Sequence, residues 1–116
     1  MLIRAPTKIL FATAPVDFRK SIDGLAAVVE LHLREAPLSG TMFAFVNRRR
    51  DGLKLLVWDH GGFALLYKKL ERGRFRVPVA AGDRVTVSPA ELAALLEGID
   101  LSRARRLPRW NPKHET

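Results

Sequence analysis

Three short apolar segments follow one another in the middle of the chain, at residues 41–46, 53–58 and 63–70. Each has the length of a β-strand, and the connections between them contain the turn signals Asp51-Gly52 and Gly61-Gly62. These connections are too short to hold a helix, so consecutive strands can pair only as antiparallel neighbours. This run of segments therefore predicts an antiparallel sheet at the centre of the fold.

Two further strands are predicted on either side of this group, at residues 8–14 and 84–87. Between the third apolar segment and the last strand, residues 74–78 alternate between charged and apolar side chains. Because the segments from residue 41 onward are joined by short turns, we expect the strands to pair in chain order as a meander.

An apolar stripe at the helical period precedes the three central segments. Its members are Ile22, Leu25, Ala26, Val29 and Leu33. Asp17 is the predicted N-cap of this main helix, with Ser21 as the alternative, and Pro37 is predicted to end it. Gly24 lies inside the stripe and weakens the helix by about 1 kcal/mol relative to alanine.

A second, shorter helix is predicted near the end of the chain. Ser88, Pro89 and Glu91 stand at the N-cap, N1 and N3 positions, which satisfies the capping box and the proline rule together. Leucines at 92, 95 and 96 follow as an amphipathic stripe, and Gly98 fits the position just after a helix.

These elements predict an α+β fold, in which an antiparallel meander of four to six strands carries the main helix on one face and the short helix closes the end. The chain of 116 residues has the length of a single domain. We assign residues 1–100 to a single domain. Residues 101–116 show no period, contain two prolines and hold five basic side chains against one acidic, which predicts a basic, mobile tail.

Composition excludes several classes of protein. The chain has no cysteine, which excludes disulfides, zinc–thiolate sites and a cysteine nucleophile. No apolar run approaches the ~18 residues that a membrane span needs, and the first residues lack the long apolar stretch of a signal peptide. We therefore expect a protein of the cytoplasm with no membrane partner.

Candidate catalytic residues are present, but none belongs to a recognised motif. The glycine-rich phosphate-binding motifs are absent, and His32, His60 and His114 are far apart in the sequence. The pair Asp59-His60 is typical of a turn rather than of acid–base catalysis. A two-metal nuclease site would need converging carboxylates, which sequence spacing alone cannot establish. We therefore expect no enzymatic activity, no metal and no cofactor.

The formal net charge is +8, from 20 lysines and arginines against 12 acidic residues. Residues 47–84 hold ten of these cations and only four acidic side chains. Such clustering favours a polyanionic partner, and nucleic acid is the first candidate, with an acidic protein or a merely solvated surface as alternatives. No base-reading helix is evident, so we expect contacts with the DNA backbone and weak sequence specificity.

The candidate DNA-contacting residues lie on the predicted hairpins and in the tail. They are Arg48, Arg49, Arg50, Lys54, Lys68, Lys69, Arg72, Arg74, Arg76, Arg105 and Arg106. Trp58, Tyr67 and Phe75 are interleaved with them. Two interpretations stay open for these aromatic residues: a platform on which bases stack, or part of the hydrophobic core.

Four blocks of the sequence carry a resemblance to a known family: residues 15–25, 43–59, 62–75 and 95–100. In this order they resemble the small accessory protein, called TnpB or Orf2-like, of the insertion sequence 66 (IS66) family of bacterial transposable elements. The matching positions are Asp17, Arg19, Lys20, Asp23, Gly24, Asn47, Arg48, Arg49, Lys54, Trp58, Asp59, Tyr67, Lys68, Leu70, Glu71, Gly73 and Phe75. Phe18 stands where the family commonly has methionine.

The resemblance implies an accessory factor for transposition rather than a catalyst, because such elements encode a separate, larger transposase that carries the strand-transfer carboxylates. It implies that transposase as a partner. The clustered positive charge adds DNA as the other expected partner, and the protein would be nucleoid-associated if DNA is bound. The alternative is a module that docks onto the transposase without binding DNA, through the helix at residues 88–99 or an open sheet edge. A homo-oligomer is also possible.

Overall fold

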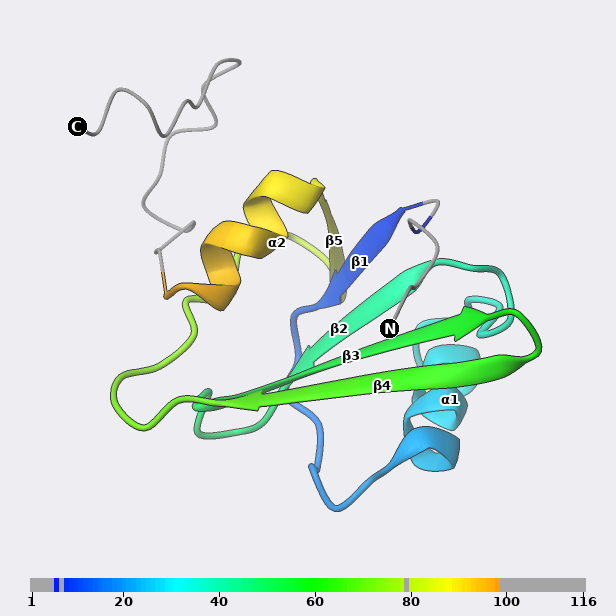
Figure 1. Ribbon diagram of the computed structural model, residues 1–116, viewed down its shortest axis with the longest axis horizontal. Helices are drawn as coiled ribbons and strands as arrows, with labels where there is room; N and C mark the ends of the chain where they lie inside the picture. Colours follow the sequence, from blue (N-terminus) through cyan, green and yellow to red (C-terminus); the bar gives the residue numbers. More distant parts are fainter. Residues whose placement is uncertain (1–5, 7, 79, 99–116) are drawn as a thin grey trace.

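The computed structural model describes residue 6, residues 8–78 and residues 80–98, and Figure 1 shows their five strands and two helices. In chain order the elements are β1 (Ile9–Ala12), α1 (Ile22–Leu31), β2 (Met42–Val46), β3 (Gly52–Asp59), β4 (Gly62–Lys69), β5 (Arg84–Val87) and α2 (Pro89–Leu96). The predicted tail at residues 101–116, with Arg105 and Arg106, lies outside the described residues.

The sheet has the strand order β4-β3-β2-β1-β5, and its pairing is mixed. The hairpins β2–β3 and β3–β4 are antiparallel, as predicted, and so is the pair β1–β5. The pair β1–β2 is parallel, so the prediction of a purely antiparallel meander is wrong. The reason is the long connection that contains α1, which returns the chain to the end of the sheet where β1 began. The strand β5 pairs with β1 and not with β4.

The two hairpin connections differ from each other. His60 and Gly61 join β3 to β4 with φ angles of 48° and 83°, which is the geometry of a two-residue turn that matches the twist of the strands. The prediction of a tight turn at Asp51-Gly52 is wrong, because β2 and β3 are joined by the five-residue loop 47–51 and Gly52 is the first residue of β3. The positive φ in that loop belongs to Arg50, at 63°.

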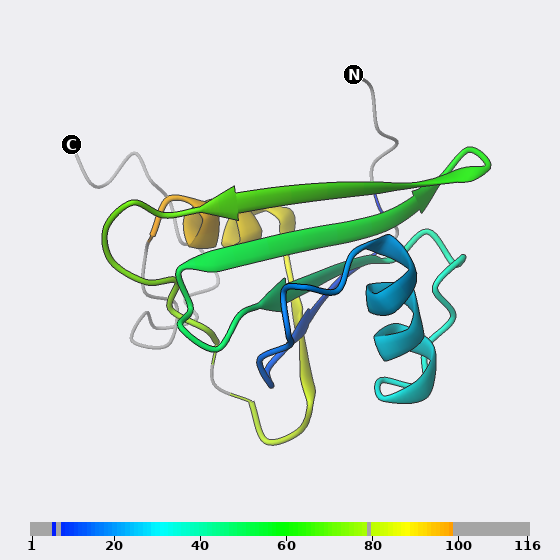
Figure 2. The same cartoon turned by 90° about the horizontal axis from the view of Figure 1, so that it is seen from below.

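Each face of the sheet is covered by a different segment, and Figure 2 shows α1 lying across the direction of β3 and β4. On the face of α1 the buried cluster is Leu10, Ala12, Leu25, Val28, Val29, Leu33, Phe43, Phe45 and Leu56. On the opposite face it is Ile9, Phe11, Ala44, Val46, Leu53, Leu55, Phe75, Val87, Leu92 and Leu95. Alternate residues of β1 and β2 therefore enter different cores. The helix α2 covers this second face instead of closing an end of the sheet.

Both helices begin after a serine at the N-cap position, and only the serine of α2 makes a capping hydrogen bond. Ser21 is the N-cap of α1, although its side chain makes no capping bond, so the prediction of Asp17 as the cap is wrong. The helix α1 ends at Leu31, before Pro37, and Leu33 is buried just beyond it. The helix α2 has the predicted capping box between Ser88 and Glu91. Gly98 follows it with a φ of 86°.

Residues 74–78 form no strand, although Phe75 is buried as the alternating pattern requires. Neither described helix is long and apolar enough to cross a membrane.

Candidate nucleic-acid interface

The loop between β2 and β3 is held in shape by the side chain of Asn47. Its Oδ1 accepts a hydrogen bond from the Gly52 amide at 3.0 Å, and its Nδ2 donates to Asp51 Oδ1 at 2.7 Å. The Asn47 carbonyl also accepts from the Arg50 amide at 3.0 Å. These hydrogen bonds are made within the loop by Asn47, Arg50, Asp51 and Gly52. The side chains of the three consecutive arginines are exposed.

Asp51 is the only acidic residue of this loop. Its hydrogen bond from Asn47 lowers the pKa of the carboxyl group, and the charges of Arg49 and Lys69 lower the pKa further while partial burial opposes them. The carboxylate lies 4.0 Å from Arg49 Nε. Within the described part of the chain, Arg48 and Arg50 form no ion pair. The loop therefore keeps a strong excess of positive charge.

The segment after β4 is attached to the back of the same loop. The Leu70 amide donates to the Asp51 carbonyl at 2.8 Å, and the Phe75 amide donates to the Arg50 carbonyl at 2.7 Å. The Phe75 ring is 1% exposed and belongs to the core, so it cannot serve as a stacking platform. The arginines near Phe75 in the sequence, Arg72, Arg74 and Arg76, are exposed.

The loop before α1 reaches the same end of the sheet. The Val16 amide donates to the carbonyl of Val46, the last residue of β2, at 2.9 Å. Asp17 then accepts hydrogen bonds from the Arg19 guanidinium at 2.6–3.1 Å and from the Arg19 amide at 2.9 Å. The guanidinium is the main cause that lowers the pKa of Asp17 to about 2. Arg19 is 92% exposed.

Lys54 fastens that loop to the sheet from inside the molecule. Its side chain is buried, and Nζ donates to the carbonyls of Phe18 at 3.0 Å and Lys20 at 2.9 Å. The ammonium also lies 4.8 Å from the Phe18 ring centre and 5.2 Å from the Tyr67 ring centre, within cation–π range. Sequence reasoning counted Lys54 among the DNA contacts, but its side chain is buried and donates two hydrogen bonds inside the protein, so we leave it out of the interface.

One other predicted DNA contact, Lys68, and the two remaining aromatic candidates, Trp58 and Tyr67, make contacts within the protein. Lys68 Nζ donates to the carbonyl of Leu96 at the end of α2, on the opposite face of the sheet. Trp58 lies at the far end of β3, where its ring packs edge-to-face on Phe63 with centroids 5.1 Å apart. Tyr67 is half-exposed, but its ring packs edge-to-face on Phe18. The three aromatic residues therefore do not gather into one platform.

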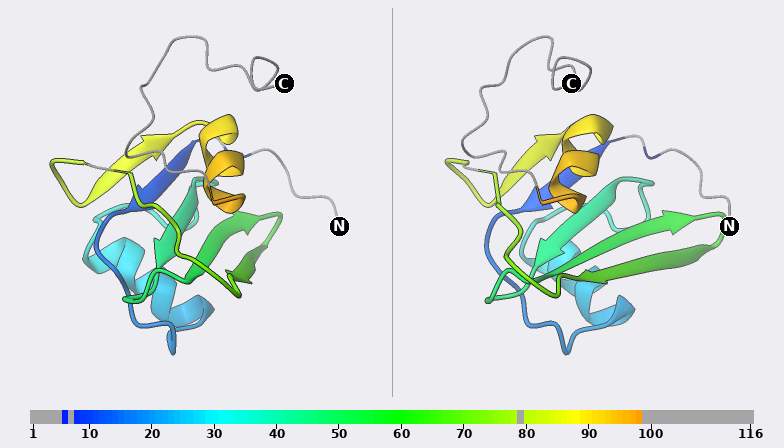
Figure 3. Two further views of the ribbon diagram at one scale, coloured as in Figure 1. Left: turned by 90° about the vertical axis from the view of Figure 1, so that its left-hand side faces the viewer. Right: turned by 60° about the vertical axis from the view of Figure 1, so that its left-hand side comes forward.

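The remaining cations form what we call the basic end, contributed by three separate segments: Arg19, Arg48, Arg49, Arg50, Lys69, Arg72, Arg74 and Arg76. Each of them is exposed. The backbone bonds described above bring these segments together, and the left-hand view of Figure 3 looks onto this end of the sheet. Arg19 was identified from the resemblance alone, because only the folded loop brings it beside Arg48 and Arg49.

A groove opens at the basic end between the loop before α1 and the loop after β2. Its volume is about 510 Å³. The lining residues are Pro15, Val16, Asp17, Phe18, Arg19, Asn47, Arg48 and Arg49. It combines an apolar wall with three guanidinium groups and one carboxylate that Arg19 already neutralises.

Many of the residues that match the family lie around these loop contacts. Asp17, Asn47 and Lys54 hold the loops together, and an added Cβ at Gly24 would lie 2.9 Å from Lys20 Cβ. Gly73 takes a φ of 78° in the segment after β4. Asp23 and Glu71 are exposed. Asp59 lies at the opposite end of β3, 3.8 Å from His60 Nε2.

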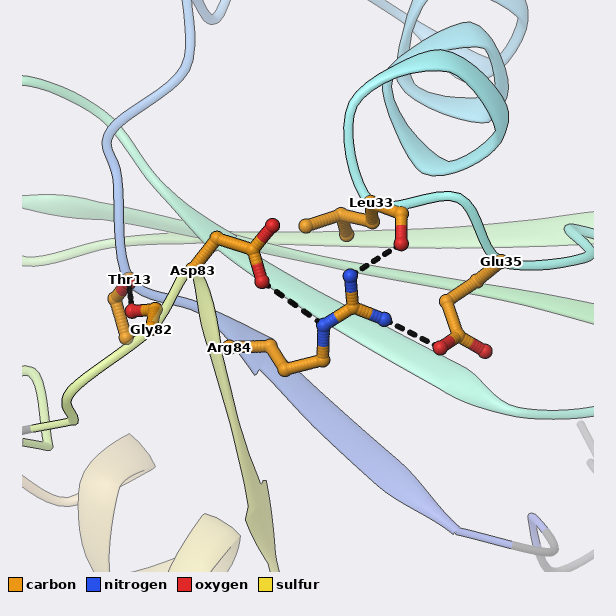
Figure 4. A network of polar contacts seen from close by, with 6 residues as sticks. All are labelled: Thr13, Leu33, Glu35, Gly82, Asp83 and Arg84. Atoms are coloured by element: carbon orange, nitrogen blue, oxygen red, sulfur yellow. Dashed lines mark hydrogen bonds and ion pairs between the residues drawn. The ribbon is translucent and has the colours of Figure 1, made fainter.

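A second polar network ties the other edge of the sheet to the end of α1, and Figure 4 shows it. The Arg84 guanidinium donates to Glu35, to the Leu33 carbonyl and to Asp83, the last at 3.0 Å. Its hydrogen bond lowers the pKa of Asp83. Thr13 Oγ1 donates to the Gly82 carbonyl at 2.9 Å beside it. With its donors committed inside the fold, Arg84 is a structural cation.

Among the described residues, no three or more histidine or acidic side chains lie close enough together to hold a metal ion.

Comparison with known proteins gives one consistent result. The family described as IS66 Orf2 like protein matches residues 7–106. Two proteins of Sinorhizobium fredii (strain NBRC 101917 / NGR234), the uncharacterized proteins y4jC and y4hO, are 38% and 37% identical over 105 residues, which is 90% of this chain and 90% of each relative. No solved structure matches. The chain belongs to the IS66 Orf2-like family, the small transposition-associated accessory proteins of these insertion elements.

Proposed function

We propose that this chain is a non-catalytic accessory factor for transposition that binds DNA through the basic end. The observation that carries the proposal is the convergence of eight exposed cations from three segments, joined by backbone hydrogen bonds, on one end of the sheet. Seven of the eight are arginines, whose planar guanidinium groups match the geometry of phosphate oxygens. Because backbone hydrogen bonds join the segments that carry the cations, the charges gather at one end of the sheet before DNA arrives.

The recognition that we propose is mostly electrostatic. Neither helix of the described residues lies at the basic end, so we expect the contacts to fall on phosphates and to carry little sequence information. Each neutralised phosphate releases counterions, and binding through five to eight phosphates would give a log–log salt slope of about −4.5 to −7. Preference for the ends of the element would then come from the transposase with which the protein works, on chromosomal DNA in the cytoplasm.

The test reverses two charges at the basic end and two elsewhere. Arg48→Glu with Arg49→Glu should strongly weaken retention on DNA, whereas Lys8→Glu with Arg34→Glu makes the same change in net charge at exposed residues outside the basic end. The control variant should keep most of the affinity. If both variants bind DNA equally well, the basic end is not the contact surface.

The second candidate function, docking onto the transposase, is favoured by a different observation. The strand β4 is the edge of the sheet, and its Leu66 and Tyr67 are 51% and 52% exposed. An open edge can accept a strand from another protein. In a pull-down with the purified transposase, Leu66→Glu should weaken capture if this edge docks, and the Arg48→Glu, Arg49→Glu variant should not.

A further inference from the structure

We infer that the groove at the basic end receives an unpaired nucleotide of a DNA strand, with its base against the apolar wall and its phosphates on the arginines. This inference rests on the proposed function and narrows it from DNA in general to DNA with unpaired bases. The site is the groove lined by residues of the two loops at residues 15–19 and 47–49, and it is separate from the edge strand β4.

The groove has apolar residues and cationic residues in its lining, and each kind complements one part of a nucleotide. Pro15, Val16 and Phe18 form apolar surface, and Asn47 supplies an amide. The guanidinium groups of Arg48 and Arg49 line the opposite side. A volume of about 510 Å³ lies within the range of clefts that hold small organic ligands. A nucleotide offers a flat apolar face and an anionic phosphate, which are the complements of these two kinds of group.

A fully paired duplex would use only half of this site. Its bases are stacked inside the helix, and the surface that it presents to a shallow protein end is sugar and phosphate. The arginines could contact that surface, but the wall made by Pro15, Val16 and Phe18 would stay in water. Proteins that bind single strands combine a positive groove with aromatic side chains on which the exposed bases stack. This groove has arginines and one aromatic residue, Phe18, in its lining.

Val16, Phe18 and Asn47 in the lining of the groove are held by contacts within the protein. The Val16 amide is bonded to β2, and the Phe18 ring is held by Tyr67, at 5.5 Å between ring centres, and by the ammonium of Lys54. Asn47 is fixed by two hydrogen bonds within its own loop. A groove that is already formed avoids the entropy cost of ordering its walls on binding.

The carboxylate of Asp17 would repel a phosphate if it were unpaired. It accepts three side-chain hydrogen bonds from Arg19, whose guanidinium balances its charge. The net charge that an entering strand meets is therefore that of Arg48 and Arg49. An acidic peptide with an aromatic residue is the competing occupant, because it too offers a flat ring and anionic groups.

The experiment compares a blunt duplex with the same duplex carrying a single-stranded overhang of about four nucleotides, by fluorescence anisotropy at one salt concentration. The overhang should bind about tenfold more tightly, since base stacking on a protein surface is of that order. Pro15→Glu places a carboxylate at the groove and should remove this preference. Ala14→Glu is the matched control, because Ala14 is the neighbouring exposed residue and does not line the groove.

The outcomes separate this inference from the function on which it rests. Equal affinity for both DNAs, or the same loss in Pro15→Glu and Ala14→Glu, overturns the inference while DNA binding by the basic end stands. No binding of either DNA overturns the proposed function as well. If a synthetic peptide of alternating glutamate and tryptophan binds the wild type but not Pro15→Glu, and the overhang gives no gain, the groove is a protein-docking site. Thermal unfolding of both variants checks that they fold.

Discussion

Lys54 is a cation whose role is decided by burial rather than by charge. It is 6% exposed, and its ammonium is enclosed by two carbonyl groups and two aromatic rings. Buried hydrogen-bond acceptors that lose their donor are costly, because water cannot replace it. Lys54 therefore acts as a clamp that holds the loop before α1 in place. Lys54 is not itself in the lining of the groove, but its ammonium contacts Phe18, which is.

We expect Lys54→Ala to lower the free energy of unfolding by about 2–4 kcal/mol, because it removes packing and two hydrogen bonds at once. Lys69→Ala is the matched control: Lys69 is exposed, and its loss should change stability by no more than about 0.5 kcal/mol. Urea denaturation measures both values. Equal stabilities for the two variants would contradict the clamp.

Asp17 provides a pH-dependent test of the same loop. Its pKa is about 2, below the ordinary value of 3.8, because the Arg19 guanidinium and amide donate to the carboxylate. The ionised form is therefore favoured in the fold, and its contribution is present above pH ~3.8 and is lost as the pH falls toward 2. In Arg19→Ala the pKa of Asp17 should rise toward 3.8, as carboxyl NMR titration would measure. An unchanged pKa would show that the ion pair does not form in solution.

At the residue scale, the sequence identified the exposed arginines but did not show which cations are buried in the fold. Lys54 and Lys69 have the same side chain, and counting charges treats them alike. The one available signal was that Lys54 interrupts the apolar run of β3 from Leu53 to Val57. Arg84 is similar, because its carboxylate partner Glu35 lies 49 positions away and only the folded sheet brings the two together.

At the scale of elements, Gly52 shows why two loops can meet so closely. A Cβ at this position would lie 2.9 Å from Phe18 Cε2 and 3.1 Å from Asn47 Nδ2, closer than van der Waals contact permits. The glycine is required by the approach of the Phe18 ring and not by the backbone of a turn. Sequence analysis interpreted this glycine as part of a tight turn, whereas its role is to make room for the Phe18 ring.

Gly52→Ala should lower the free energy of unfolding by about 1–3 kcal/mol, because the ring or the strand must move. The same change should cost less in a Phe18→Ala background, where the closest atom is gone, and a double-mutant cycle measures this coupling. Gly82→Ala is the control, since no atom lies within 4 Å of its Cβ position. Additive effects of the changes at Gly52 and Phe18 would exclude the contact.

The element boundaries that could be predicted are those set by local chemistry. The capping box of α2, the bounds of β5 and the apolar runs of β2 to β4 depend on neighbouring residues. The pairing of β1 with both β2 and β5 depends on where α1 returns the chain, which no local pattern encodes. For the same reason the position of α2 on the second face of the sheet was not predictable.

At the scale of the whole molecule, the fold separates a structural body from a charged end. Apolar side chains fill both faces of the sheet, and Arg84 and Lys54 are used inside it. The eight cations of the basic end are exposed at the surface instead. The groove among them could not be found from sequence, because its two walls come from loops about 30 positions apart.

The most direct test of this account is the salt dependence of DNA binding by the wild type and by the Arg48→Glu, Arg49→Glu variant. The account predicts a log–log slope of about −4.5 to −7 for the wild type, and a slope shallower by about 0.9 for each phosphate contact that the variant loses. The Lys8→Glu, Arg34→Glu control should keep the wild-type slope. Wild-type binding without salt dependence, or an unchanged slope in the Arg48 and Arg49 variant, would contradict it.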